Sequence, residues 1–176
     1  MKQNPIKLSR YFCLVLVVAF TSCTGDTQSS KGPSSPPAVI SSSAQVVKVG
    51  AVPVNVSQSS PVDAVIALSI SPGFHINANP ATFPYLIATE VTTEGVEGIH
   101  VGTPVYPDAI KKKFQFAEEP LAVYEGELPI KLNLRAEANA STGRMSLPVN
   151  VRVQACDEEQ CFPPATIRTA IPVTVK

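Results

Sequence analysis

Two cysteines near the C-terminal end of the sequence have a spacing that suits disulfide chemistry. Cys156 and Cys161 are separated by the tetrapeptide Asp-Glu-Glu-Gln, which has the length of a hairpin loop. Residues opposite each other in a hairpin can be cross-strand partners, with Cβ atoms close enough for a disulfide bond. The pair could therefore exchange electrons with other thiols, or it could only staple a hairpin together.

The residues around the cysteines affect how reactive the two sulfurs can be. Asp157 and Glu158 place negative charge beside them, which disfavours the thiolate and is expected to raise the pKa of both thiols. Phe162 is followed by two prolines, which lack backbone donors and leave a stiff edge without ladder hydrogen bonds. Cys156 shares the sequence parity of the polar residues before it, so its side chain is predicted to point away from the core and to be reachable by a partner. Asp157, Glu158 and Phe162 are therefore candidates for modulating the pair.

A metal site is another interpretation of these residues. Two cysteines with four residues between them fall within the spacing of zinc ligands, but no second pair follows, and His75 and His100 lie in distant segments. No metal or other cofactor is expected. The sequence contains no Ser-His-Asp arrangement, phosphate-binding loop or metalloprotease motif, so a hydrolase is not expected either.

The elements that must position the cysteines are β-strands. Apolar residues alternate with more polar ones in four segments, which are 62–70, 128–134, 149–155 and 167–175. No segment has a convincing helical pattern. Short strands separated by turns predict an all-β fold, specifically an immunoglobulin-like antiparallel β-sandwich. The parity of the apolar residues switches within 46–56, which predicts a bulge or bend near Gly50 to Pro53.

The first 22 residues have the features of a bacterial export signal. Three basic residues precede an apolar run at 11–20, which is too short to span a bilayer as a helix. Thr21 and Ser22 precede Cys23 in a sequence that resembles the lipobox of bacterial lipoproteins. The expectation is cleavage before Cys23 and acylation of that cysteine, with simple secretion as the alternative.

The sequence is predicted to have three parts. Residues 1–22 form the signal, residues 23–44 form a disordered tether rich in serine and proline, and residues 45–176 form the β-sandwich domain. Because the signal carries three basic residues and no acidic ones, 11 basic and 14 acidic residues remain, a net charge of −3 that argues against a nucleic-acid partner.

The predicted location is the periplasmic side of a bacterial membrane, where disulfides can form and persist. Membrane contact is expected through the lipid anchor only, because no other stretch has 18 consecutive apolar residues. The outer membrane is favoured over the inner one. The protein is secreted if Cys23 is not acylated.

The cysteine segment resembles a known family. The run VQACDEEQCFPP at residues 153–164, together with SPGFHIN at residues 71–77, is similar to the N-terminal periplasmic domain of DsbD-type thiol:disulfide interchange proteins. The likeness covers about residues 46–176. It implies an immunoglobulin-like fold and a relay of electrons from a membrane-embedded partner to periplasmic oxidoreductases, by exchange between cysteine pairs.

The resemblance also implies roles for individual residues. Cys156 and Cys161 correspond to the redox pair, and Cys161, which precedes Phe-Pro-Pro, resembles the cysteine that enters the mixed disulfide. The family shields its cysteines with an aromatic cap loop, and residues 113–119 fall in about the right region. Phe114 or Phe116 is thus a candidate lid, although two alternating aromatic residues are equally consistent with ordinary strand core.

Two departures from the family pattern bear on function. The loop between the cysteines has four residues where the best-known member has five, and the sequence ends at Lys176 without the membrane domain or the thioredoxin-like domain. The expected partners are therefore extracytoplasmic thioredoxin-like or other redox proteins and a separate membrane electron donor. The leading hypothesis is a thiol-disulfide oxidoreductase domain of the protein-disulfide reductase type. The alternative is a lipoprotein interaction module whose disulfide is only structural.

Overall fold

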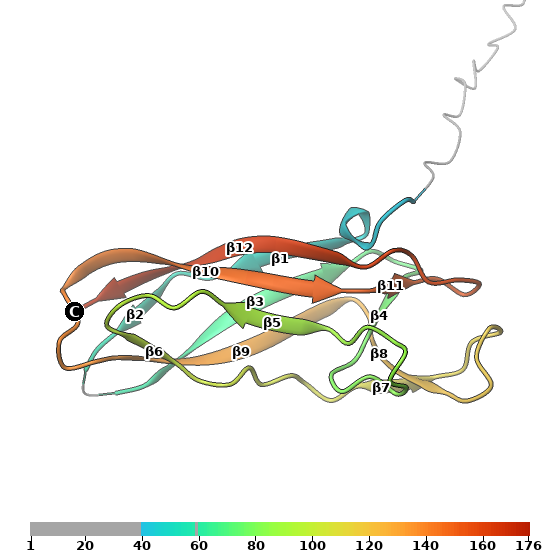
Figure 1. Cartoon of the computed structure of the whole chain (residues 1–176), viewed down its shortest axis with the longest axis horizontal. Coiled ribbons are helices and arrows are strands. Elements are labelled where there is room, and N and C mark those ends of the chain that lie inside the picture. The colour runs from blue at the N-terminus through green and yellow to red at the C-terminus, as the bar shows by residue number, and fades with distance from the viewer. Residues whose placement is uncertain (1–39, 59) are drawn as a thin grey trace, which may run out of the picture. The chain divides into compact units, whose positions relative to one another are not determined.

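The computed structural model describes residues 40–58 and 60–176, which form an all-β unit with one short 3-10 helix (Figure 1). The expected signal, Cys23 and most of the expected tether lie outside these residues. The elements in chain order are η1 (Ser43–Gln45), β1 (Val47–Ala51), β2 (Val54–Val56), β3 (Val62–Ile70), β4 (His75–Asn77), β5 (Glu90–Thr93), β6 (Ile99–Val101), β7 (Ile110–Lys112), β8 (Leu121–Tyr124), β9 (Glu127–Ala136), β10 (Gly143–Val153), β11 (Ala155–Cys156) and β12 (Ala165–Val175).

The strands form three sheets of four. The first has the order β1-β3-β9-β6, the second β2-β12-β10-β5 and the third β11-β4-β8-β7. All neighbouring strands are antiparallel except β2, which runs parallel to β12. The predicted immunoglobulin-like antiparallel β-sandwich is confirmed, with this one parallel pair.

The long strands bury one face each, as their alternating sequences predict. In β9 every second residue is buried, and the buried residues of β3, β10 and β12 join them in one hydrophobic core between the first two sheets. The four alternating segments of the sequence are these four strands, although the third one ends at Val153 rather than Ala155.

The parity switch near Gly50 marks a passage between sheets. The chain leaves the first sheet at the end of β1, and β2 then lies beside β12 in the second sheet. Since a strand that changes sheets must present its other face to the same core, the apolar residues move from odd to even positions. The predicted bend is therefore real, and its cause is a crossing of the sandwich.

The third sheet gathers at one end of the sandwich, where β4, β7, β8 and β11 lie together (Figure 1). A tight turn leads into it: Pro72 and Gly73 occupy the central positions, Gly73 has φ of 84°, and the Phe74 amide donates to the Ser71 carbonyl over 3.1 Å. Pro followed by Gly with positive φ is the signature of a type II turn. The turn starts β4 at His75, directly opposite Cys156.

A second, smaller hydrophobic cluster lies beneath the third sheet. Its buried members are Phe114, Leu121 and Val123, and its partly buried members are Phe83, Leu86 and Ala117. Small clusters of this kind commonly form under long loops, separate from the main core. The cysteine end of the domain thus has packing of its own.

Candidate functional site

The two cysteines form a disulfide bond. Cys156 and Cys161 are an isolated antiparallel bridge pair, with an S–S distance of 1.95 Å and a Cα–Cα distance of 3.9 Å. The predicted cross-strand placement is therefore confirmed. On the inner side of this pair, the Phe162 amide donates to the Ala155 carbonyl over 2.8 Å and continues the antiparallel pairing by one residue.

The tetrapeptide between the cysteines is closed by its own hydrogen bonds. The Asp157 amide donates to the Gln160 carbonyl over 2.9 Å, and one Asp157 carboxylate oxygen accepts from the amides of Glu159 and Gln160, each over 2.8 Å. This is the turn that aspartate side chains characteristically form with the backbone after them. Asp157 thus organises the loop, and its predicted effect on the thiol pKa values stays a prediction.

Glu158 is held by a lysine from another strand. Lys112 of β7 contacts a Glu158 carboxylate oxygen at 2.9 Å and a Glu125 carboxylate oxygen at 2.7 Å. Its ammonium also lies 5.4 Å from the centre of the Phe114 ring. Lys112 therefore ties the cysteine loop to β7 and to the residue after β8, and it offsets part of the negative charge that the sequence places beside the sulfurs. Both carboxylates are partly exposed, so each pair contributes little to stability by itself.

The two cysteines differ in burial. Cys156 is fully buried, whereas Cys161 is partly exposed. The prediction that a partner can reach Cys156 directly is therefore wrong. Its neighbour Ala155 belongs to the main hydrophobic core, so the alternation of buried core residues continues from β10 to that position. Cys156 follows on β11, opposite His75, and it is buried outside the main core.

Cys161 lines an open, mainly apolar cavity of about 290 Å³. The other residues that line it are Tyr85, Leu86, Phe116, Ala117, Leu121, Glu159 and Gln160. Tyr85 is 73 % exposed and stacks on Phe83, with ring centres 5.3 Å apart. Cys161 thus borders an apolar surface that another protein could contact.

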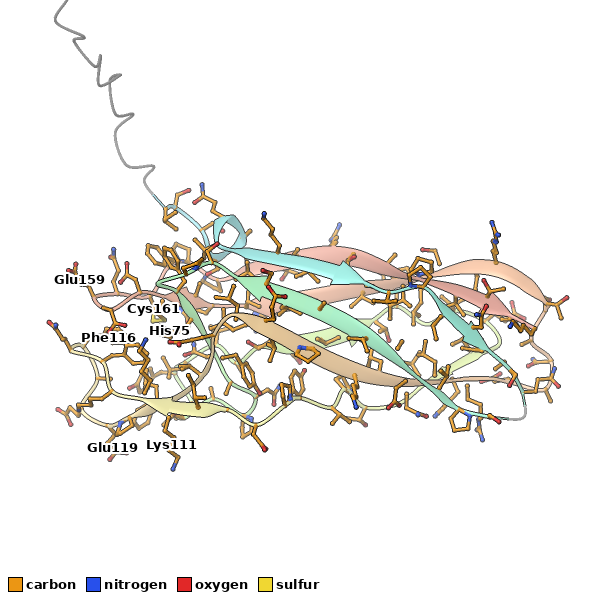
Figure 2. All side chains as sticks on the ribbon, turned by 180° about the vertical axis from the view of Figure 1, so that it is seen from behind. His75, Lys111, Phe116, Glu119, Glu159 and Cys161 are labelled. Atoms are coloured by element: carbon orange, nitrogen blue, oxygen red, sulfur yellow. A yellow bond between two sulfur atoms is a disulfide. The ribbon has the colours of Figure 1, made fainter. Side chains whose placement is uncertain are left out.

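The two candidate lid residues occupy different environments. Phe114 is 2 % exposed and lies between His75 and Phe116, with ring centres 3.9 Å and 5.3 Å away. Phe116 is 40 % exposed and shares the cavity with Cys161. Figure 2 shows His75, Phe116 and Cys161 at the same end of the domain. The structure therefore brings residues 113–119 to the cysteines, with Phe114 as packing and Phe116 at the surface.

The Phe162 side chain is packed inside the domain and is not exposed at its surface. Its side chain is buried and lies against Phe74 of the turn before β4, with ring centres 5.8 Å apart. Pro163 and Pro164 remain exposed between this anchor and the start of β12. The aromatic residue thus fixes the chain just after Cys161.

His75, to which the sequence assigned no catalytic role, is a buried member of this site. It is 1 % exposed, its ring stacks on Phe114, and its Nε2 atom has no hydrogen-bond partner. Burial, and next the positive charge of Lys112, lower its pKa from 6.5 to about 4, against the opposing effects of Glu125, Glu158 and Asp157. The imidazole is therefore neutral at physiological pH.

The lowered pKa of His75 predicts a loss of stability in mild acid. As the pH falls from 6.5 to about 4, the unfolded chain takes up a proton that the folded protein does not, so the free energy of unfolding decreases. We expect this decrease to be about 2 kcal/mol, because solvent screens part of the effect of the charged groups nearby. Urea denaturation of the His75→Phe variant should show a correspondingly smaller loss over this range. The matched control is His100→Gln, which changes an exposed histidine; an acid response in His75→Phe equal to that of the wild type would contradict this account.

Among residues 40–58 and 60–176, no group of three or more His, Cys, Asp or Glu side chains is placed to hold a metal ion. Within the same residues, no helix is long and apolar enough to cross a membrane.

Comparison with known proteins identifies one family. The family model described as "Thiol:disulfide interchange protein DsbD, N-terminal" matches residues 43–172. No curated protein sequence matches the chain.

Two solved structures are similar in fold. The N-terminal domain of Neisseria meningitidis DsbD in its reduced form is 17 % identical, with a TM-score of 0.43 over 63 % of this chain and 77 % of that one. The N-terminal periplasmic domain of ScsB from Proteus mirabilis is 12 % identical, with a TM-score of 0.42 over 73 % of this chain and 45 % of that one. The present chain thus spans less than half the length of the ScsB structure.

Proposed function

Since this chain belongs to the family of the N-terminal domain of the thiol:disulfide interchange protein DsbD, we propose that it relays electrons between the cysteine pairs of other proteins through a reversible Cys156–Cys161 disulfide. Thiol-disulfide exchange in general follows from the family and from the disulfide itself. The relay of electrons between other proteins is the more specific part of the proposal. It would make the domain a thiol-disulfide oxidoreductase of the protein-disulfide reductase type.

The observation that carries this proposal is the unequal burial of the two sulfurs. Cys161 lines an open apolar cavity, while Cys156 is fully buried. An exchange reaction requires one sulfur to be accessible along the line of attack, and it benefits when the leaving sulfur is held in place. A disulfide that only staples a hairpin needs neither an accessible sulfur nor an apolar surface beside it.

The electron transfer takes place in two exchange steps. A thiolate of a reduced partner attacks Cys161 Sγ, the bond to Cys156 breaks, and Cys156 leaves as a thiolate that takes up a proton. The second thiol of the partner then loses its proton and attacks the partner's own sulfur in the mixed disulfide, which releases Cys161 as a thiolate that also takes up a proton. Two electrons and two protons have passed to this domain, and the same steps in reverse deliver them to an oxidised acceptor.

Partners and location belong to the same proposal. Thioredoxin-like or other extracytoplasmic redox proteins would exchange with Cys161, and a separate membrane protein would supply the electrons. A periplasmic location agrees with the family and with the export signal expected at residues 1–22. Acylation of Cys23 and the tether expected after it would hold the domain near a membrane, with the outer membrane favoured; the domain itself already includes Ser43 of the expected tether.

Equilibration of the full chain in glutathione buffers tests the relay. We expect a reduction potential above about −300 mV, because structural disulfides of secreted proteins lie below that value and catalytic ones above it. We also expect the reduced protein to remain folded, since so short a loop gains less than about 3 kcal/mol from its disulfide. Alkylation of free thiols reports the potential, and circular dichroism reports the fold.

The double variant Cys156→Ser/Cys161→Ser is the control for alkylation elsewhere in the chain. A potential well below −300 mV together with unfolding on reduction would make the disulfide a staple. The protein would then be the lipoprotein interaction module that the sequence leaves as the alternative.

A further inference from the structure

A buried serine at the start of the domain is bonded to both sides of the cysteine loop. Ser43 begins η1, and its side chain is fully buried. Its hydroxyl donates to the Pro163 carbonyl over 2.8 Å and accepts from the Ala155 amide over 2.9 Å. Its own amide donates to the same Pro163 carbonyl over 3.1 Å. One residue therefore makes three hydrogen bonds to the segment that carries the disulfide.

The two bonded positions flank the cysteines closely. Ala155 immediately precedes Cys156, and Pro163 lies two residues after Cys161. Three other ties join the flanks: the Phe162 amide donates to the Ala155 carbonyl over 2.8 Å, the Gln154 side-chain amide donates to the Phe162 carbonyl over 3.5 Å, and the β10–β12 ladder ends beside them with Val153 opposite Ala165. Ser43 comes from more than 100 residues away in the sequence, so it acts as a third chain segment that connects the two flanks.

We propose that Ser43 is a positioning residue of the redox pair, which holds the flanks of the cysteine loop together when the disulfide is open. This inference rests on the proposed reversible disulfide and adds a determinant of its potential. In the oxidised protein the covalent bond itself keeps Cys156 and Cys161 opposed. In the reduced protein that task falls to the bonds of Ser43, together with the bonds that Phe162 makes to Ala155 and Gln154 and the end of the β10–β12 ladder.

Because these bonds keep the flanks together in the reduced protein, each cysteine thiol has a high effective concentration near the other. Groups held in the geometry of the product react at effective concentrations far above those of groups that must first find each other. Without the hydroxyl, the Ala155 amide loses this acceptor, whereas the Pro163 carbonyl still accepts from the Ser43 amide. In the reduced protein the flanks can separate, and water can then hydrate the Ala155 amide. In the oxidised protein the flanks cannot separate, so this amide stays buried and poorly paired. Loss of the hydroxyl therefore disfavours the oxidised state relative to the reduced state.

The test compares Ser43→Ala with Ser42→Ala in the full chain. Ser42 caps η1 by accepting from the Ala44 amide, and none of its hydrogen bonds reaches the cysteine flanks. We expect Ser43→Ala to raise the equilibrium constant for reduction by glutathione about tenfold, the worth of one hydrogen bond, which corresponds to a potential about 30 mV less negative. Ser42→Ala should leave that constant unchanged.

A purely structural role for Ser43 gives a different result. In that case Ser43→Ala lowers the melting temperature of the oxidised and reduced forms equally and leaves the reduction potential unchanged. That result would overturn the inference. A more negative reduction potential in Ser43→Ala would overturn it as well. A wild-type potential well below about −300 mV contradicts the proposed relay instead, whatever the variant does.

Hydrogen exchange provides a measurement that does not depend on the variant folding. The amide of Ala155 in the reduced wild-type protein should remain protected to a similar degree as in the oxidised protein, because the Ser43 hydroxyl still accepts from it. Loss of that protection on reduction, with the rest of β10 still protected, would show that Ser43 does not hold the open pair and would overturn the inference.

Discussion

With Cys156 replaced by serine, the remaining Cys161 thiol is expected to react with a small alkylating reagent at least about 100-fold faster than the Cys156 thiol does when Cys161 is replaced. Cys161 is partly exposed at the edge of an open cavity, and reagents can reach it in the folded state. Cys156 is fully buried opposite His75, so it reacts only after local opening. A factor of 100 corresponds to a local opening that costs about 3 kcal/mol.

The same pair of variants identifies the sulfur that enters the mixed disulfide. Cys156→Ser should form a lasting mixed disulfide with glutathione at Cys161, because the neighbouring thiol that would release it has been replaced. Cys161→Ser should form very little. In urea, where the burial is lost, both thiols should react at similar rates, which controls for the intrinsic reactivity of each one. Equal rates in the folded state would assign no preference to Cys161, and faster reaction of Cys156 would reverse the assignment.

The long strands of this fold are predictable from sequence because each one buries a single face. In β9 buried and exposed residues alternate without a break over ten residues, so the period of two is evident in the sequence alone. The strands β4, β5 and β6 contain only three or four residues, too few for any period to be recognised. Tertiary pairing rather than local pattern determines them.

Parity in the sequence indicates which face of a strand a residue occupies, but it does not show what covers that face. Near Gly50 the switch in parity is visible in the sequence, and only the structure shows that it marks a crossing from the first sheet to the second. At Cys156 the parity continues without a switch, because Val153 and Ala155 both belong to the main core. Cys156 is buried all the same, so the accessibility predicted for it was wrong.

The site was predictable as far as its residues are close in sequence or belong to a family motif. The cysteine pair and the aromatic segment 113–119 do come together, as expected. The bonds from Ser43 to the cysteine flanks span more than 100 residues, and a lone serine at the end of a polar segment carries no signal for them. Lys112 was missed although it directly precedes the predicted cap segment, since a lysine at a strand end is most often a solvated charge.

Replacing Phe114 with alanine is expected to lower the free energy of unfolding by about 3–5 kcal/mol, whereas replacing Phe116 should cost about 1 kcal/mol or less. Phe114 is almost fully buried and contacts His75 on one side and Phe116 on the other, so its removal leaves a cavity in the smaller hydrophobic cluster. Phe116 is 40 % exposed, and its removal leaves no enclosed space.

The two variants should also separate packing from shielding. Phe116 lines the cavity that leads to Cys161, so Phe116→Ala should speed reduction of the disulfide by dithiothreitol several-fold while the protein stays folded. Denaturant titration and the rate of thiol release measure the two effects independently. If Phe116→Ala leaves the rate unchanged, no lid exists at this position. If Phe114→Ala accelerates the reaction without a loss of stability, the lid is Phe114 and the burial of its ring is not a packing requirement.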